Sequence, residues 1–136
     1  MNRLFKYIFV IMALIWLIPV SADPAKVLIN KEFSLGIGRS ASIDGEKLII
    51  KFKAVLEDSR CPINALCAWA GNGKVEFEVL DSDGQNKTII LNTEDEPRSA
   101  PLKGHKLKLV SLNPPRIDGV SISPRDYSVT LYVERK

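Results

Sequence analysis

The sequence is poor in the side chains that usually carry out catalysis. It contains a single histidine, His105, and two cysteines, Cys61 and Cys67. If the cysteines pair with each other, neither thiol remains as a nucleophile for that histidine. A Ser-His-Asp site that uses His105 is one alternative, because its members can be far apart in sequence, and a histidine on the surface is the other. We favour the second, and with it a protein that has no catalytic residues.

Soft metal ligands are equally scarce. Both methionines, Met1 and Met12, precede residue 23, and paired cysteines offer no thiolate to zinc or copper. Residues 81–86 alternate oxygen-bearing side chains like a calcium loop, but Gly84 comes too early for an EF-hand and no glutamate follows at the bidentate position. A hairpin turn explains this stretch better. We therefore predict no metal ion and no cofactor.

No apolar run is long enough to cross a bilayer comfortably. Residues 7–18 form a run of about a dozen apolar residues, against the roughly 20 that a spanning helix needs. A basic start precedes the run, and Pro19 and a small-x-small tripeptide ending at Ala22 follow it, as in a secretory signal peptide. We predict a signal peptide at residues 1–22, cleaved after Ala22 or, as a second choice, after Ala25. An uncleaved membrane anchor is the alternative. The protein is then exported, to the periplasm or to the medium.

An excess of positive charge is also missing once this segment is removed. Losing Arg3 and Lys6 from the 19 Lys and Arg leaves 17, against 16 Asp and Glu. A nearly neutral chain gives no electrostatic reason to bind nucleic acid. Residues 23–136 suffice for one domain with a single modest core. We expect a monomer with no membrane span after cleavage.

Helical periodicity is absent, and short alternating segments take its place. Apolar and polar residues alternate in several stretches, and turn-forming residues such as Asp44-Gly45 lie between them. This pattern predicts an all-β fold, an antiparallel β-sandwich with Ig-like proportions and six or seven strands. Residues 92–104 are expected to form a loop with at most a short edge segment. Val120 and Ile122 form either a short strand or a cover for the edge of the core. The predicted strands are 27–29, 32–38, 47–57, 74–80, 87–91, 105–112 and 127–134.

The clearest of these strands is 47–57. Its apolar side chains recur at every second position, which predicts that one face of the strand is buried. A helix would scatter the same side chains around its circumference. The five residues expected on the buried face are Leu48, Ile50, Phe52, Ala54 and Leu56.

The stretch of residues 57–73 holds both cysteines and the only tryptophan after residue 22. In an oxidising compartment, Cys61 and Cys67 are most simply one disulfide that closes a short loop. In a structural interpretation, Asp58 and Arg60 either pair or bond to the backbone of the loop, Pro62 shapes the loop entry and Trp69 covers the end of the core beside the disulfide. In a functional interpretation, the disulfide holds Arg60 and Trp69 exposed for a partner. We prefer the structural interpretation and regard Asp58, Arg60, Pro62 and Trp69 as a candidate binding loop.

Asp58-Ser59-Arg60-Cys61-Pro62, four further residues and Cys67-Ala68-Trp69-Ala70-Gly71 resemble a motif, D-S-R-C-P-x4-C-x-W-x-G. The motif is found in small exported bacterial proteins of unassigned function, and residues 107–115 and 126–131 resemble the C-terminal half of that family. Many members are lipid-anchored, whereas no cysteine closely follows the apolar run here. The resemblance implies a bacterial host and a fold, and it implies no activity.

Two functions are consistent with the sequence. The first is a non-enzymatic binding or interaction module of the cell envelope, with a small protease inhibitor as one subclass. Its partner would be an unknown protein or another envelope component. The alternative is a small envelope hydrolase that uses His105 and carboxylates.

Overall fold

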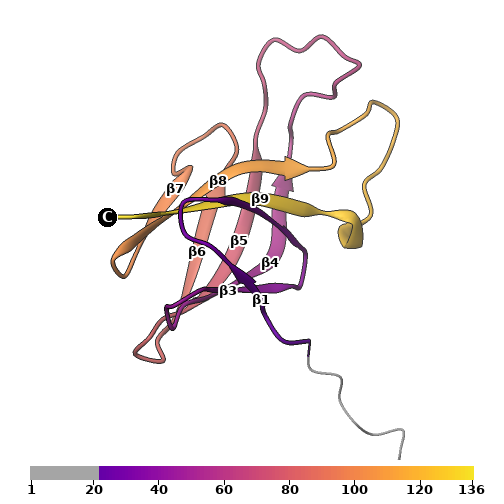
Figure 1. Cartoon of the computed structure of the whole chain (residues 1–136). Helices are drawn as coiled ribbons and strands as arrows, with labels where there is room; N and C mark the ends of the chain where they lie inside the picture. Colours follow the sequence, from indigo (N-terminus) through magenta and orange to yellow (C-terminus); the bar gives the residue numbers. More distant parts are fainter. Residues whose placement is uncertain (1–21) are drawn as a thin grey trace, which may run out of the picture.

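The computed structural model describes residues 22–136, and strands dominate this part of the chain (Figure 1). Most of the predicted signal peptide, residues 1–21, lies outside the described residues. Cleavage after Ala22 leaves the first strand, β1 (Ala25–Val27), whole, whereas cleavage after Ala25 removes its first residue. Within residues 22–136, no helix has the length and apolar character needed to cross a membrane.

Two sheets make up the fold. Every pairing between strands is antiparallel except that of β1 with β3. A short 3-10 helix, η2 (Pro124–Asp126), precedes the last strand. The prediction of an all-β antiparallel sandwich is confirmed. The first sheet has the order β1-β3-β4-β5-β6, with β3 (Ser40–Ile43), β4 (Ile49–Asp58), β5 (Gly73–Leu80) and β6 (Asn86–Asn92). The second has the order β2-β9-β8-β7, with β2 (Glu32–Gly36), β7 (Ser99–Leu102), β8 (His105–Asn113) and β9 (Ser128–Arg135).

The hydrophobic core lies between the two sheets and follows from alternation along the strands. In β5, Val75, Phe77 and Val79 are buried while the glutamates between them are half-buried. Each sheet gives one face to the core, as the period of two in a strand requires. The fully buried side chains include Ile43, Ile50, Phe52, Val75, Phe77, Leu91, Leu107, Leu109, Val129, Leu131 and Val133.

The prediction of which β4 side chains are buried is wrong for the second half of the strand. Ile50 and Phe52 are buried as expected, but Leu56 is exposed and Val55 packs against the core instead. The pairing of β4 with β5 shifts register after Phe52 and again after Val55. Each shift is a β-bulge, in which an extra residue reverses the side that the following residues face.

The structure also contains β3, a strand of four residues that the sequence did not reveal. β7, also of four residues, is the short edge segment expected within the loop 92–104, and it is the edge strand of its sheet. Together they raise the number of strands to nine within the described residues. The connection 116–126 forms no strand, and its Val120 is exposed and bridges only to Ile117.

Candidate functional site

The loop between β4 and β5, residues 59–72, is called the cysteine loop below. Cys61 and Cys67 are joined by a disulfide with an S–S distance of 2.06 Å and a Cα–Cα distance of 6.0 Å, which confirms the predicted bridge. Pro62 lies at the entry, where its carbonyl accepts a hydrogen bond of 3.2 Å from the amide of Ala65. The loop extends beyond the ends of both sheets (Figure 1).

The base of the cysteine loop continues the ladder between β4 and β5. The amide of Ser59 donates to the carbonyl of Asn72 at 2.8 Å, and the amide of Cys61 donates to that of Ala70 at 2.6 Å. Gly71 makes this close approach possible. It has φ +70°, and a Cβ there would lie 1.8 Å from the carbonyl oxygen of Ser59. The two arms of the loop are therefore fixed together without any contribution from the hydrophobic core.

Arg60 fastens the loop to the opposite sheet. Its guanidinium donates two hydrogen bonds of 2.7 Å to the carboxylate of Asp58 and others to the carbonyls of Leu112 and Pro114. The side chains of Arg60 and Asp58 are only 14% and 9% exposed. The predicted pairing of Asp58 with Arg60 is thus present. The expectation of an exposed Arg60 available to a partner is wrong, because the side chain is largely buried and all three guanidinium nitrogens donate within the protein.

Tyr127 completes this buried arrangement. Its hydroxyl donates to Asp58 Oδ2 at 2.9 Å. Burial on its own would raise the pKa of Asp58, but the hydrogen bonds from Arg60 and Tyr127 and the charge of Arg60 lower that pKa below its ordinary value. Burial and the neighbouring carboxylate raise the pKa of Tyr127. Asp58 is therefore ionised at neutral pH and bonds both Arg60 in the cysteine loop and Tyr127, the residue before β9.

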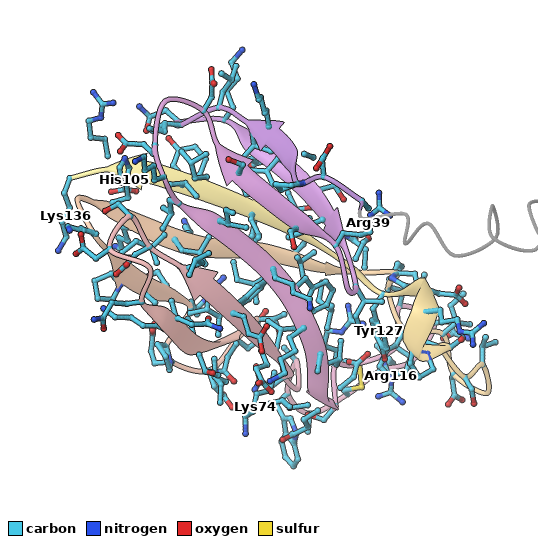
Figure 2. The ribbon with its side chains drawn as sticks, turned by 90° about the horizontal axis from the view of Figure 1, so that it is seen from below. Arg39, Lys74, His105, Arg116, Tyr127 and Lys136 are labelled. Carbon is cyan, nitrogen blue, oxygen red and sulfur yellow. A yellow bond between two sulfur atoms is a disulfide. The ribbon has the colours of Figure 1, made fainter. Side chains whose placement is uncertain are left out.

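A second set of contacts ties the outer arm of the cysteine loop to the connection after β8. The amide of Ile63 donates to the carbonyl of Arg116 at 2.9 Å, and the Asn64 side-chain oxygen accepts from the amide of Asp118 at 2.8 Å. Arg116 Nη1 donates to the carbonyl of Arg60 at 2.8 Å. In Figure 2, Arg116 and Tyr127 lie at the same end of the molecule as the disulfide. The loop is consequently held along its length as well as at its base.

The predicted burial of Trp69 is wrong. Its side chain is 78% exposed, and two other large apolar side chains of the loop, Ile63 and Leu66, are 69% and 105% exposed. We call these three side chains the apolar tip. The loop projects past the end of the core, so Trp69 has no buried surface within reach. Trp69 is exposed as the functional interpretation expects, and Arg60 is not.

Asn72 is a structural residue that sequence reasoning missed. It is buried, its Nδ2 donates to Asn92 Oδ1 at 2.9 Å, and its Oδ1 accepts from the amides of Glu94 and Asp95 at 3.3 and 3.4 Å. These bonds fix the β6–β7 connection beside the exit of the cysteine loop. A groove of about 380 Å³ lies there, with Trp69, Glu94 and Asp95 among its lining residues. An asparagine between two glycines, Gly71 and Gly73, was the available signal.

His105 is buried, so the expectation of a histidine on the surface is wrong. The side chain is 6% exposed, its Nδ1 donates to the carbonyl of Lys103 at 2.9 Å, and its Nε2 lies 3.7 Å from Glu46 Oε1 without a hydrogen bond. It adjoins a cavity of about 130 Å³ that Ser82 also lines. His105 lies at the end of the molecule opposite Arg116 (Figure 2). It shares the buried face of β8 with Leu107 and Leu109, and this alternation could have revealed its burial.

The acidic stretches outside the loop have local structural roles. Asp81 Oδ1 accepts hydrogen bonds of 2.9 and 3.0 Å from the amides of Asp83 and Gln85, and Gly84 has a φ of +76°. Residues 81–85 therefore form the hairpin turn between β5 and β6. Among the described residues, no three His, Cys, Asp or Glu side chains are grouped in a way that could hold a metal ion.

Together, the fold and the loop define an all-β sandwich that carries a projecting, disulfide-closed loop with an apolar tip. No family model, no curated protein and no solved structure matches this chain. The interpretation of its function therefore depends on the chemistry of the loop.

Proposed function

We propose that the protein is an exported binding module of the cell envelope that recognises another protein through the cysteine loop. The main observation in support is the apolar tip, since Ile63, Leu66 and Trp69 are all exposed on one loop. Several large apolar side chains left in water on one short loop are typical of an interaction site. Tryptophan is also among the residues that contribute most to binding energy at interfaces.

The rigidity of the loop supports the same proposal. The disulfide, the ladder at the base and the bonds of Arg60 fix the backbone that carries the tip. A loop that is already ordered loses little conformational entropy when a partner binds, so more of the contact energy appears as affinity. A rigid backbone that carries exposed apolar side chains suits binding, whereas the hydrophobic core does not include the side chains of the tip.

Export is supported by the start of the chain and by the disulfide. The apolar run with its basic start and small-residue exit is typical of a signal peptide. The Cys61–Cys67 bridge forms and persists most readily in an oxidising compartment. An envelope location, periplasmic or secreted, satisfies both observations.

The projecting, covalently closed loop also suits the protease-inhibitor subclass, because a stiff convex loop can fill a concave active site. Under this proposal, the purified domain inhibits an exported protease, and residues 62–69 are protected from cleavage in the complex. Mass spectrometry of the mixture tests it. Rapid cleavage within the loop without inhibition would contradict it.

The alternative function, a hydrolase, depends on the other end of the molecule. Glu46, Ser82 and His105 line one small cavity there. His105 Nε2 makes no hydrogen bond, so the structure shows no activated serine nucleophile. A fluorophosphonate probe separates the two functions. Labelling of Ser82 that is lost in His105→Gln favours the hydrolase, and absence of labelling favours the binding module.

The test of the binding module compares two double variants of residues 23–136. In Leu66→Ser/Trp69→Ser, the apolar tip is removed; in Leu28→Ser/Leu80→Ser, two side chains that are 50% and 40% exposed elsewhere are removed as a control. Each form is immobilised and incubated with envelope extract, and the captured proteins are quantified by mass spectrometry. We expect a partner that the control retains and the tip variant loses. Equal capture by both variants would refute the proposal.

A further inference from the structure

The groove beside Trp69 combines acidic and aromatic lining residues. Glu57, Glu94 and Asp95 line it together with Trp69 and residues 70–72. No lysine or arginine is among its lining residues. Within residues 22–136, Glu94 and Asp95 form no ion pair, and Glu57 lies 3.5 Å from Lys74. The groove therefore offers two carboxylates without a cationic partner.

The backbone that carries these two carboxylates is held in place by the buried Asn72. Its side-chain oxygen accepts from the amides of Glu94 and Asp95, and its amide group donates to Asn92. Thr93 adds two hydrogen bonds between the β6–β7 connection and the start of β5. Its amide donates to the carbonyl of Gly73 at 3.0 Å, and its hydroxyl accepts from the amide of Gly73 at 2.8 Å. The acidic side and the loop that carries Trp69 are thus parts of one connected structure.

We infer that this groove receives a lysine or arginine side chain of the partner, whose apolar neighbours pack on Ile63 and Leu66. The inference depends on the proposed function of the loop and specifies the chemistry of the partner. An ammonium or guanidinium group over the face of a tryptophan is attracted by the ring, and carboxylates at the edge add a second attraction. A partner segment in which a basic residue stands beside apolar residues is complementary to the groove in charge and to the apolar tip in polarity.

Charge also argues against two other classes of partner. Nucleic acid and anionic lipid surfaces would bring phosphates against Glu94 and Asp95, and like charges at an interface weaken binding. An apolar tip with a tryptophan can enter a membrane interface, where that residue is enriched. The carboxylates beside it oppose such an approach to an anionic bilayer. A cationic protein segment is the occupant that satisfies the tip and the groove together.

The experiment uses residues 23–136 with the disulfide intact and a short peptide of alternating lysine and leucine. Its counterpart carries the same sequence with every lysine acetylated, which removes the charge and keeps the apolar part. Affinity is measured by calorimetry, and Trp69 emission is followed in parallel. We expect the lysine peptide to bind at least about tenfold more tightly than the acetylated one. Its affinity should fall between about 0.01 M and 0.15 M salt, where the Debye length drops from about 30 Å to about 8 Å.

Variants identify the groove as the place of binding. Glu94→Gln/Asp95→Asn should weaken the lysine peptide about threefold or more and flatten its salt dependence, in line with the strength of exposed ion pairs. Glu32→Gln/Glu134→Gln removes the same charge from exposed positions on the other sheet and should change little. Trp69→Leu keeps an apolar side chain and removes the aromatic face, so it should weaken the lysine peptide and leave the acetylated one unchanged.

Three results with the peptides would overturn the inference: equal affinity for the two peptides, no binding of the lysine peptide at about 1 mM, or equal losses from the two acidic double variants. Vesicles of phosphatidylcholine with phosphatidylglycerol form a separate arm. A blue shift of Trp69 emission with these vesicles would assign the tip to a membrane and also overturn it. A different result refutes the proposed function: capture of envelope proteins that does not depend on Leu66 and Trp69.

Discussion

Replacing Arg60 with alanine provides the sharpest test of how the cysteine loop is held. The substitution leaves the carboxylate of Asp58, which is 9% exposed, without its cationic partner. It also removes the donors to the carbonyls of Leu112 and Pro114. Removing one partner of a buried, hydrogen-bonded ion pair costs about 3–5 kcal/mol. We therefore expect Arg60→Ala to lose about 3–5 kcal/mol of the free energy of unfolding.

The measurement is urea denaturation followed by far-ultraviolet circular dichroism, because the exposed Trp69 reports poorly on the core. With a slope of about 1–3 kcal/mol per molar urea, such a loss lowers the midpoint by at least about 1 M. Arg60→Lys keeps the charge but not the planar group that reaches Asp58 and two carbonyls at once, so its loss should be smaller than that of alanine. Arg125→Ala, at an exposed position of η2, should stay within about 0.5 kcal/mol.

A loss below about 1 kcal/mol for Arg60→Ala would refute this reasoning. That value is typical of ion pairs on the surface, where water replaces the missing partner. It would mean that Asp58 and its neighbouring carbonyls are solvated in solution. The loop would then be held by its ladder and disulfide alone.

Four other predictions follow from the same structure. Because the pKa of Asp58 is lowered in the folded state, its stabilising contribution is complete above its unfolded pKa of about 4 and is lost as the pH falls through the folded value. The difference in unfolding free energy between the natural protein and Asp58→Asn should therefore shrink below about pH 4, and a constant difference would contradict the pairing. Trp69→Ala should change stability by less than about 0.5 kcal/mol, and native Trp69 emission should match that of free tryptophan in water; a strongly blue-shifted maximum argues for burial. Gly71→Ala should cost at least about 1–2 kcal/mol because of its φ of +70° and the nearby Ser59 carbonyl, and more than Gly84→Ala, whose Cβ meets nothing within 4 Å; equal costs would argue against the close approach. Phe52→Ala should cost about 3–5 kcal/mol and Leu56→Ala far less, as denaturation of both variants will show; similar costs would remove the case for the bulges.

Much of the fold could be predicted from the sequence because its long strands alternate without interruption. β5 and β9 keep a strict period of two, and buried residues alternate with less buried ones along them, as that pattern predicts. β4 departs from the period at its bulges, which depend on how β4 pairs with β5 and leave no local signal. β3 escaped detection because it has only four residues. β7 was expected only as a short edge segment, since it is equally short and contains Pro101, which is tolerated at the edge of a sheet.

The candidate site was predictable in its covalent part and less so in its exposure. Export and the spacing of the cysteines led to the disulfide, and the pairing of Asp58 with Arg60 was among the structural roles expected for the loop. The exposure of Trp69 could not be read from its size and apolarity, which favour burial in general. It depends on where the core ends relative to the loop, and that position is set by the ladder between the two arms. Asn72 was missed because its partners belong to a distant part of the chain.

The place where the chain enters the domain determines how the loop is presented. β1 pairs with β3 through Ala25 and Ala41, and Ala41 in turn pairs with Ile50 near the start of β4. The cysteine loop follows Asp58, eight residues further along that strand, or about 26 Å at roughly 3.3 Å per residue. The entry point and the apolar tip therefore lie at opposite ends of the sandwich (Figure 1). A tether, a tag or a solid support joined through β1 would orient the domain with its tip outward, so the molecule can be coupled to a surface from that end while the tip still meets its partner.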